Sequence, residues 1–199
     1  MLGIFLDSET NGLNPRTHYV LEIAFDLVDL STGISKFKYQ TLINQDVVDW
    51  EKSDQTSLKI NGFTWEEVSQ GKSLREVSQE IIDLFAKFDI QRKRAVFICQ
   101  NPSFDRAFFS SIVDPKTQDI LNWPYHWLDL ASMHWALTIN KAKLETGPLP
   151  WDTGLSKDKI AAFYNLPPEE KPHRAMNGVA HLIQCYKAVV GFPKVTLKD

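Results

Sequence analysis

Cysteine is scarce in this chain of 199 residues, which contains only Cys99 and Cys185. Proteins whose fold depends on a disulfide framework have more cysteines than this, so that class is excluded. The low cysteine content is typical of a protein from a reducing compartment.

Long hydrophobic runs are also missing. The apolar segment at the N-terminus, residues 2–6, stops at Asp7 and Glu9. No basic residues precede it, and it is too short to be the apolar core of a signal peptide. No other segment approaches the roughly 20 apolar residues that a membrane-spanning helix needs. These absences predict a soluble protein of the cytoplasm.

The chain lacks an excess of positive charge. Its 22 lysines and arginines are outnumbered by 25 acidic residues, which gives a net charge of −3. Proteins that coat duplex nucleic acid carry a large positive excess and are excluded. An enzyme that holds nucleic acid through metal ions and a local basic patch is compatible with this balance.

What is present indicates one globular domain. Hydrophobic residues make up 43% of the chain and charged residues 24%, a normal globular balance. The length is below the roughly 250 residues at which chains tend to split into domains. No repeat, low-complexity segment or linker divides the chain, so residues 1–199 are predicted to form a single domain.

The hydrophobic pattern predicts an α/β fold with a mixed sheet. Three strands come first, and the alternation of apolar residues over 19–30 is the clearest strand signal. A turn at residues 31–33 should join the strands at 19–30 and 34–43 as an antiparallel hairpin. Strands are expected at 2–6, 19–30, 34–43, 94–99 and 125–128. Helices are expected after the capping box of Ser73 and Glu76, after Asn101-Pro102, and over 130–137, 156–164 and 175–190. Residues 46–61 are expected to be irregular, with at most one helical turn.

Asp7 and Glu9 are the sharpest local feature. Residues two apart on a strand point to the same side, so both carboxylates should face one place at the end of the first strand. Open α/β sheets bind ligands beyond the carboxyl ends of their strands. Two carboxylates so close repel each other, and a bound Mg²⁺ or Mn²⁺ would relieve that repulsion. The alternative is a solvated acidic strand end.

Asp105 and His173 are further candidates. Asp105 follows the strand at 94–99, and a parallel pairing of that strand with the first would bring it near Asp7. Its alternative role is that of an aspartate in the first turn of a helix, where it favours the helix dipole. His173 precedes the last predicted helix and could accept a proton from a water molecule. Its alternative is an ordinary surface histidine.

Taken together, these residues resemble a known pattern. Residues 5–15 (FLDSETNGLNP) look like the first motif of the DEDD-type, DnaQ-like 3′–5′ exonucleases, and residues 101–109 (NPSFDRAFF) look like the second. Residues 173–177 (HRAMN) resemble the start of the third motif in the histidine-containing DEDDh branch. The motifs occur in the family's order, and the resemblance extends over residues 2 to about 190.

The resemblance implies a ribonuclease H-like fold, a mixed five-stranded sheet flanked by helices. It implies two ions of Mg²⁺ or Mn²⁺ held by Asp7, Glu9 and Asp105, with His173 deprotonating the attacking water. The implied substrate is a single-stranded 3′ end of DNA or RNA, from which nucleoside 5′-monophosphates are released. Residues that match substrate-binding positions are Thr10, Leu13 and Asn101, although Thr10 and Leu13 could equally serve the turn and the core.

The sequence departs from the family at one place. The third motif should end in an aspartate five residues after His173, but that position is Gly178, and Ala180 is not acidic either. The substitution could be engineered, natural and weakening, or compensated by another carboxylate, with Asp152 and Asp158 as the nearest upstream candidates. If the acid is simply missing, activity should be low in Mg²⁺ and partly recovered in Mn²⁺, and Gly178→Asp should raise the rate.

Two other function classes stay open. A binding module for single-stranded nucleic acid without catalysis would agree with the missing aspartate, and a metal-dependent phosphatase is disfavoured by the order of the motifs. Two groups of residues could contact nucleic acid in either case, although solvated surfaces and core packing are the commoner roles of such groups. They are the basic clusters at 92–94, 157–159 and 171–174, and the tryptophans Trp123, Trp127, Trp135 and Trp151.

Overall fold

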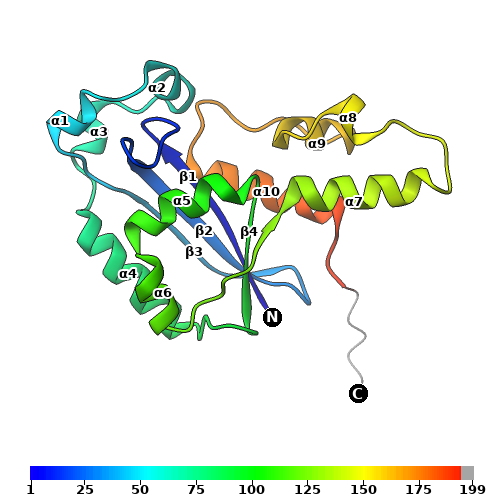
Figure 1. Ribbon diagram of the computed structural model, residues 1–199, viewed down its shortest axis with the longest axis horizontal. Coiled ribbons are helices and arrows are strands. Elements are labelled where there is room, and N and C mark those ends of the chain that lie inside the picture. Colours follow the sequence, from blue (N-terminus) through cyan, green and yellow to red (C-terminus); the bar gives the residue numbers. More distant parts are fainter. Residues whose placement is uncertain (194–199) are drawn as a thin grey trace.

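The first strand of the chain lies at the centre of a five-stranded mixed sheet (Figure 1). The computed structural model describes residues 1–193. The strand order is β3-β2-β1-β4-β5. The strands are β1 (Leu2–Thr10), β2 (Val20–Asp29), β3 (Ile34–Leu42), β4 (Ala95–Cys99) and β5 (Trp127–Asp129). β1 pairs with β2 in antiparallel orientation and with β4 in parallel orientation, and β4 pairs with β5 in parallel orientation. These pairings confirm the predicted mixed sheet.

The turn between β2 and β3 forms where the sequence predicts it. Asp29 accepts hydrogen bonds from the backbone and the hydroxyl of Ser31, and its carbonyl accepts one from Gly33 N. Gly33 has a φ of +74°, a value that glycine adopts without steric cost. The tight reversal makes β3 the antiparallel neighbour of β2.

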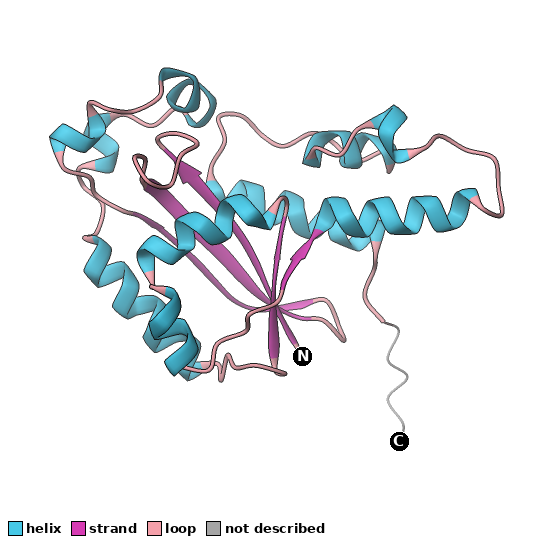
Figure 2. Cartoon of the chain, viewed as in Figure 1, coloured by secondary structure: helices cyan, strands magenta, loops and turns pink. Residues whose placement is uncertain are grey.

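The predicted helices are present, several with shifted ends, and Figure 2 shows how they surround the sheet. The larger helices are α4 (Leu74–Lys87), α5 (Pro102–Ile112), α7 (Leu130–Ala142), α9 (Lys157–Phe163) and α10 (Ala175–Val189). Ser73 and Glu76 form the predicted capping box of α4. Within residues 1–193, none of the helices has the length and apolar character needed to cross a membrane.

The prediction of irregular chain over 46–61 is wrong. This part contains α1 (Val47–Trp50) and α2 (Gln55–Asn61), and α3 (Trp65–Val68) follows. Each begins with a side-chain cap, from Asp46, Asp54 and Thr64 respectively. The segment is polar and lacks a long apolar stripe, so its short helices depend on caps and on contacts with the sheet edge. Two further short helices, α6 (Pro115–Ile120) and α8 (Pro150–Thr153), were also not predicted.

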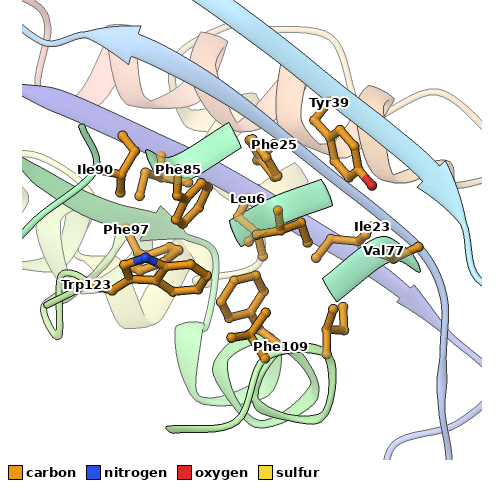
Figure 3. Packing of buried hydrophobic residues seen from close by; sticks show 14 of the residues in the cluster. Leu6, Ile23, Phe25, Tyr39, Val77, Phe85, Ile90, Phe97, Phe109 and Trp123 are labelled. Carbon is orange, nitrogen blue, oxygen red and sulfur yellow. The ribbon is translucent and has the colours of Figure 1, made fainter. Parts of the chain in front are cut away.

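The sheet is covered on both faces. One face packs against α4 and α5 through an aromatic-rich cluster, part of which is shown in Figure 3. There Phe97 stacks on Trp127 at a centroid distance of 4.0 Å, and Phe85 contacts Trp123 at 4.6 Å. The other face packs against α7, α9 and α10 through a second cluster centred on Phe5 and Leu182. The site therefore rests on strands that are buried on both sides.

A buried glutamate joins the sheet to the last helix. Glu22 of β2 is 4% exposed, and its Oε2 accepts a hydrogen bond of 2.7 Å from Ala175 N, the first residue of α10. Its Oε1 accepts one of 2.7 Å from Gln40 Nε2 on β3. A carboxylate at a helix N-terminus satisfies a free N–H and favours the helix dipole. Glu22 thereby fixes where α10 begins, two residues after His173.

We expect Glu22→Gln to destabilise the protein by about 1–3 kcal/mol, because a neutral amide replaces the buried carboxylate that accepts from Ala175 N at the start of α10. Urea unfolding followed by circular dichroism measures this. The matched control is Glu145→Gln, an exposed glutamate, for which a change within about 0.5 kcal/mol is expected. Equal stability of the two variants would show that Glu22 does not anchor α10.

Candidate active site

The candidate site lies beyond the carboxyl ends of the parallel neighbours β1 and β4. Asp7, Ser8 and Glu9 belong to the last part of β1, and α5 begins three residues after β4 ends. The loop before α10 passes beside the arrowhead of β1 in Figure 1, where it is drawn in orange. Parallel strands end at the same edge of the sheet, so groups that follow each of them meet there.

Asp105 is held against β1 from the first turn of α5. Its side chain is 3% exposed, and its Oδ1 accepts a hydrogen bond of 2.8 Å from Ser8 Oγ. Ser8, which is not among the residues predicted for the site, lies between Asp7 and Glu9 and points to the opposite side of β1. The hydrogen bond shows that the strand contributes to the site from both of its sides.

His173 is positioned by its backbone and by its neighbour. Its N–H donates to Ile60 O at 3.2 Å. The guanidinium of Arg174 stacks on Phe63 at 3.9 Å and pairs with Glu67 at 3.1 Å. Arg174 is therefore engaged in anchoring this loop to α2 and α3, which differs from the phosphate contact considered for the cluster at 171–174.

One cavity of about 320 Å³ collects the predicted catalytic residues. The lining residues that matter for its chemistry are Asp7, Glu9, Asp105, His173, Lys157, Asp158 and Glu169. The solvated strand end considered for the first pair is wrong for Glu9, which is 9% exposed. Among residues 1–193, however, no three acidic, histidine or cysteine side chains are already arranged to hold one metal ion.

Burial gives the carboxylates of this site unusual affinities for protons. It raises the pKa of Asp7 to about 6, with Lys157 opposing the shift and Glu169 adding to it. Burial, helped by repulsion from Asp7, raises the pKa of Glu9 to about 8. Burial followed by the charge of Asp7 also raises the pKa of Asp105 well above its usual range, against the hydrogen bond from Ser8. Crowded acids of this kind need a nearby cation to ionise together.

Lys157 and Glu169 complete the cluster, and neither was identified from the sequence as part of the site. Lys157 Nζ lies 2.9 Å from Glu169 Oε2 and 3.5 Å from Asp7 Oδ1. Burial lowers the pKa of Lys157, but Asp7 and Glu169 outweigh it and raise the pKa above the usual value. In the sequence, Lys157 belongs with Lys159 to a basic cluster that could contact phosphates or form a solvated face, and Glu169 stands in the unpatterned run PPEEK. No spacing signal in the sequence marks either residue.

The space next to Gly178 is already filled. A Cβ atom built on Gly178 would overlap with Asp7 Oδ2 and would lie 3.1 Å from Glu169 Oε1. Gly178→Asp alone is therefore not the simple restoration that the sequence suggests, because Asp7 would have to move. Of the proposed replacements, Asp152 is exposed and does not line the cavity, whereas Asp158 lies at its rim and accepts a hydrogen bond from Glu169 N at 3.0 Å.

The predicted substrate-binding residues occupy different surroundings. Thr10 is 6% exposed and its hydroxyl donates to Gly12 O at 2.7 Å, which is the turn role. Leu13 is 77% exposed, so it is not part of the core. Asn101 lines the cavity with a φ of +57°, and its side chain accepts from Ser103 Oγ but does not cap α5.

The tryptophans divide into two pairs. Trp123 is 3% exposed and Trp127 stacks on Phe97, so both belong to the core. Trp135 and Trp151 are 40% and 57% exposed and lie 5.4 Å apart, at the α7–α8 end of the molecule. Neither of the exposed rings lines the cavity.

The chemistry of the donor set fits a hard divalent cation. Carboxylate oxygens are the ligands that Mg²⁺ and Mn²⁺ prefer, and Asp7, Glu9 and Asp105 present them from two elements around one cavity. The buried Glu169 Oε1 has no hydrogen-bond partner among the described residues. Asp7, Glu9 and Asp105 are the residues that would hold such an ion.

We expect the metal-free protein to lose stability as the pH rises from about 4 to about 8. The folded state holds protons on Asp7 and Glu9 up to about pH 6 and 8, whereas their usual pKa values are 3.8 and 4.5. The folded state thus binds more protons in this range, and stability must fall as the pH rises. Melting temperatures in EDTA between pH 5 and 8.5 measure the slope.

The variant Glu9→Gln, which mimics the protonated side chain, should flatten this slope. Added Mn²⁺ competes with the protons and should stabilise the unmodified protein more at pH 8 than at pH 6. Stability in EDTA that increases over this range would contradict the prediction.

Comparison with known proteins relates this geometry to one enzyme family. The family RNase_T, described as Exonuclease, matches residues 4–186. The chain is 27% identical over 201 residues to "Exonuclease DPD1, chloroplastic/mitochondrial" of Arabidopsis thaliana, covering 98% of this chain and 58% of that protein. The chain therefore spans a little over half the length of that relative.

Solved structures share the fold at low sequence identity. E. coli exonuclease I in complex with a dT13 oligonucleotide superimposes with a TM-score of 0.73 and 16% identity, over 94% of this chain and 40% of that one. The cell-death related nuclease CRN-4 gives a TM-score of 0.71 and 12% identity, over 94% of this chain and 62% of that one. These matches confirm the ribonuclease H-like fold. The family match over residues 4–186 shows that this chain belongs to the RNase_T exonuclease family.

Proposed function

We propose that the chain is a metal-dependent 3′–5′ exonuclease that releases nucleoside 5′-monophosphates from single-stranded 3′ ends. The observation that carries the proposal is the cavity in which Asp7, Glu9, Asp105 and His173 meet, in a member of an exonuclease family. Three separate segments of the chain contribute these groups, and an accidental surface cluster does not explain the burial of Glu9 and Asp105.

The residues divide the work by their chemistry. Asp7, Glu9 and Asp105 would hold Mg²⁺ or Mn²⁺, which supplies positive charge and Lewis acidity beside the scissile phosphate when bound. His173 would accept the proton of the attacking water, a role for which imidazole is suited near neutral pH. Ser8 keeps the carboxylate of Asp105 turned toward the site.

The proposal specifies the class of nucleic acid and does not choose between DNA and RNA. One structural neighbour was solved with a dT13 oligonucleotide, and another is described as a 3′-exonuclease that recognises a histone mRNA stem-loop. We propose a single-stranded 3′ end of DNA or RNA as the substrate. The location in the cytoplasm stays a prediction, consistent with the free, buried thiols of Cys99 and Cys185.

We expect the protein to shorten a linear single strand from its 3′ end and to release mononucleotides. The assay uses DNA and RNA oligonucleotides with Mn²⁺, labelled at the 5′ end to follow shortening and at the 3′-terminal nucleotide to identify the product. A 3′-phosphate should slow the reaction, and EDTA should stop it. Cleavage of a circular single strand would contradict the proposed polarity.

Replacing His173 by glutamine should lower kcat by about 10²–10⁴-fold, the usual contribution of a general base. Binding of an uncleaved oligonucleotide should change little, since His173 acts on the water. The matched control is His126→Gln, an exposed histidine that does not line this cavity and should leave the rate unchanged. If both variants keep full activity, another group accepts the proton.

The second candidate function is binding of single strands without cleavage. The absence of an acid at position 178 and the ammonium of Lys157 among the carboxylates favour it. The same oligonucleotides distinguish the two functions, because a binding module should retain them equally well in Mn²⁺ and in EDTA and should leave them intact. Degradation that requires Mn²⁺ would exclude this alternative.

A further inference from the structure

The ammonium group of Lys157 has three partners inside the candidate site. Its Nζ contacts Glu169 Oε2 at 2.9 Å and Asp7 Oδ1 at 3.5 Å, and it donates to Gly178 O at 3.3 Å. One of its protons is donated to Gly178 O, and the two carboxylates form ion pairs with the same group. The side chain is 12% exposed, and it is the only lysine or arginine among the described residues that line this cavity.

Asp7 and Glu169 together fill the space toward which a side chain at position 178 would point. A Cβ atom on Gly178 would lie 3.1 Å from Glu169 Oε1. The Glu169 side chain is 4% exposed, and Oε1 has no hydrogen-bond partner in the described part of the chain. A buried carboxylate oxygen without a partner is costly, and it is well suited to face a cation. Glu169 thus brings a carboxylate next to position 178, where the chain has no acid of its own.

The helix α9 places both members of this pair. Lys157 is its first residue, and Ser156 caps it by accepting from Lys159 N. The next residue, Asp158, accepts a hydrogen bond from Glu169 N at 3.0 Å. Ile160 of α9 is fully buried against the sheet and α10. The lysine is therefore held by a packed helix and is not a mobile surface side chain.

A divalent ion placed between Asp7 and Glu169 cannot be present together with the ammonium of Lys157. Such an ion would lie about 2 Å from each carboxylate oxygen, within the space that the ammonium fills. Two cations at that separation repel each other strongly. Lys157 therefore takes the side of Glu169, and the carboxylates of Asp7, Glu9 and Asp105 remain for a divalent ion.

We propose that the ammonium of Lys157 is a built-in substitute for one of the two divalent ions expected from the family resemblance, with Glu169 as its counter-charge in place of the missing aspartate. The chain then binds a single divalent ion, through Asp7, Glu9 and Asp105. This inference rests on the proposed metal-dependent function and specifies which cations balance the carboxylates of the same site.

Counting bound Mn²⁺ tests the inference independently of activity. The full chain is titrated with Mn²⁺, and free Mn²⁺ is read by electron paramagnetic resonance, with and without thymidine 5′-monophosphate. We expect about one Mn²⁺ per chain in both conditions. Binding of two Mn²⁺ ions by the unmodified protein would overturn the inference, and this measurement requires no variant.

Removing the ammonium should create the second ion site. Lys157→Met is expected to bind about two Mn²⁺, and the double variant Lys157→Met/Glu169→Gln about one. The matched control Lys159→Met removes an exposed lysine from the same helix and should keep one ion. If Lys157→Met does not fold in EDTA, Lys157→Gln, which retains two donors, replaces it. A single ion in the folded Lys157 variant would contradict the inference.

The melting temperature supplies a second readout. Without the ammonium, the carboxylates of Asp7 and Glu169 face each other unpaired, so Lys157→Met should be less stable than the unmodified protein in EDTA. Mn²⁺ should raise its melting temperature more than that of the unmodified protein, because it binds an additional ion. Equal shifts in the two proteins would argue against a second site.

The exonuclease assay on the unmodified protein separates this inference from the proposed function. Degradation of 3′ ends with two bound ions would support the function and refute the inference. One bound ion without any degradation would support the inference and refute the function.

Discussion

The mutual repulsion of carboxylates at the end of β1 is the constraint on which the rest of the site depends. Asp7 and Glu9 are brought together by the two-residue repeat of a strand, and Asp105 and Glu169 approach from other elements. Burial raises the pKa values of Asp7 and Glu9, and the repulsion from neighbouring carboxylates adds to that effect. A cation is required for these groups to ionise together, and in this chain part of the requirement is met by Lys157.

The scaffold resists that repulsion because the strands behind the site are buried on both faces. Phe5 and Leu6, which precede Asp7, belong to the two different hydrophobic clusters. Glu22 fixes the start of α10, while Arg174 and Asn61 connect the loop of His173 to α2 and to the end of β1. The short helices after β3 thus have a positional task, since they hold the segment that carries His173.

Much of the fold could be predicted from the sequence because its signals are local. The alternation in β2, the Ser31-Thr32-Gly33 turn and the Ser73–Glu76 capping box each depend on neighbouring residues, and each is found in the structure. The short helices α1, α2 and α3 were missed because they are stabilised by caps and distant contacts more than by their own periodicity. The exonuclease motifs were recognisable for the same reason as the strands, since each is a compact run of residues.

The sequence by itself determined the mixed sheet, the grouping of Asp7 with Glu9, and the absence of an acid at Gly178. Only the tertiary structure decided what takes the place of that acid. Glu169 lies nine residues before Gly178 and Lys157 twenty-one before it, and neither separation corresponds to a repeat of a helix or a strand. They meet because α9 and the loop before α10 fold over the same edge of the sheet. Contacts between elements that pack in space carry no periodic signal along the chain, and this is the physical reason why the charge balance of the site could not be derived from the sequence.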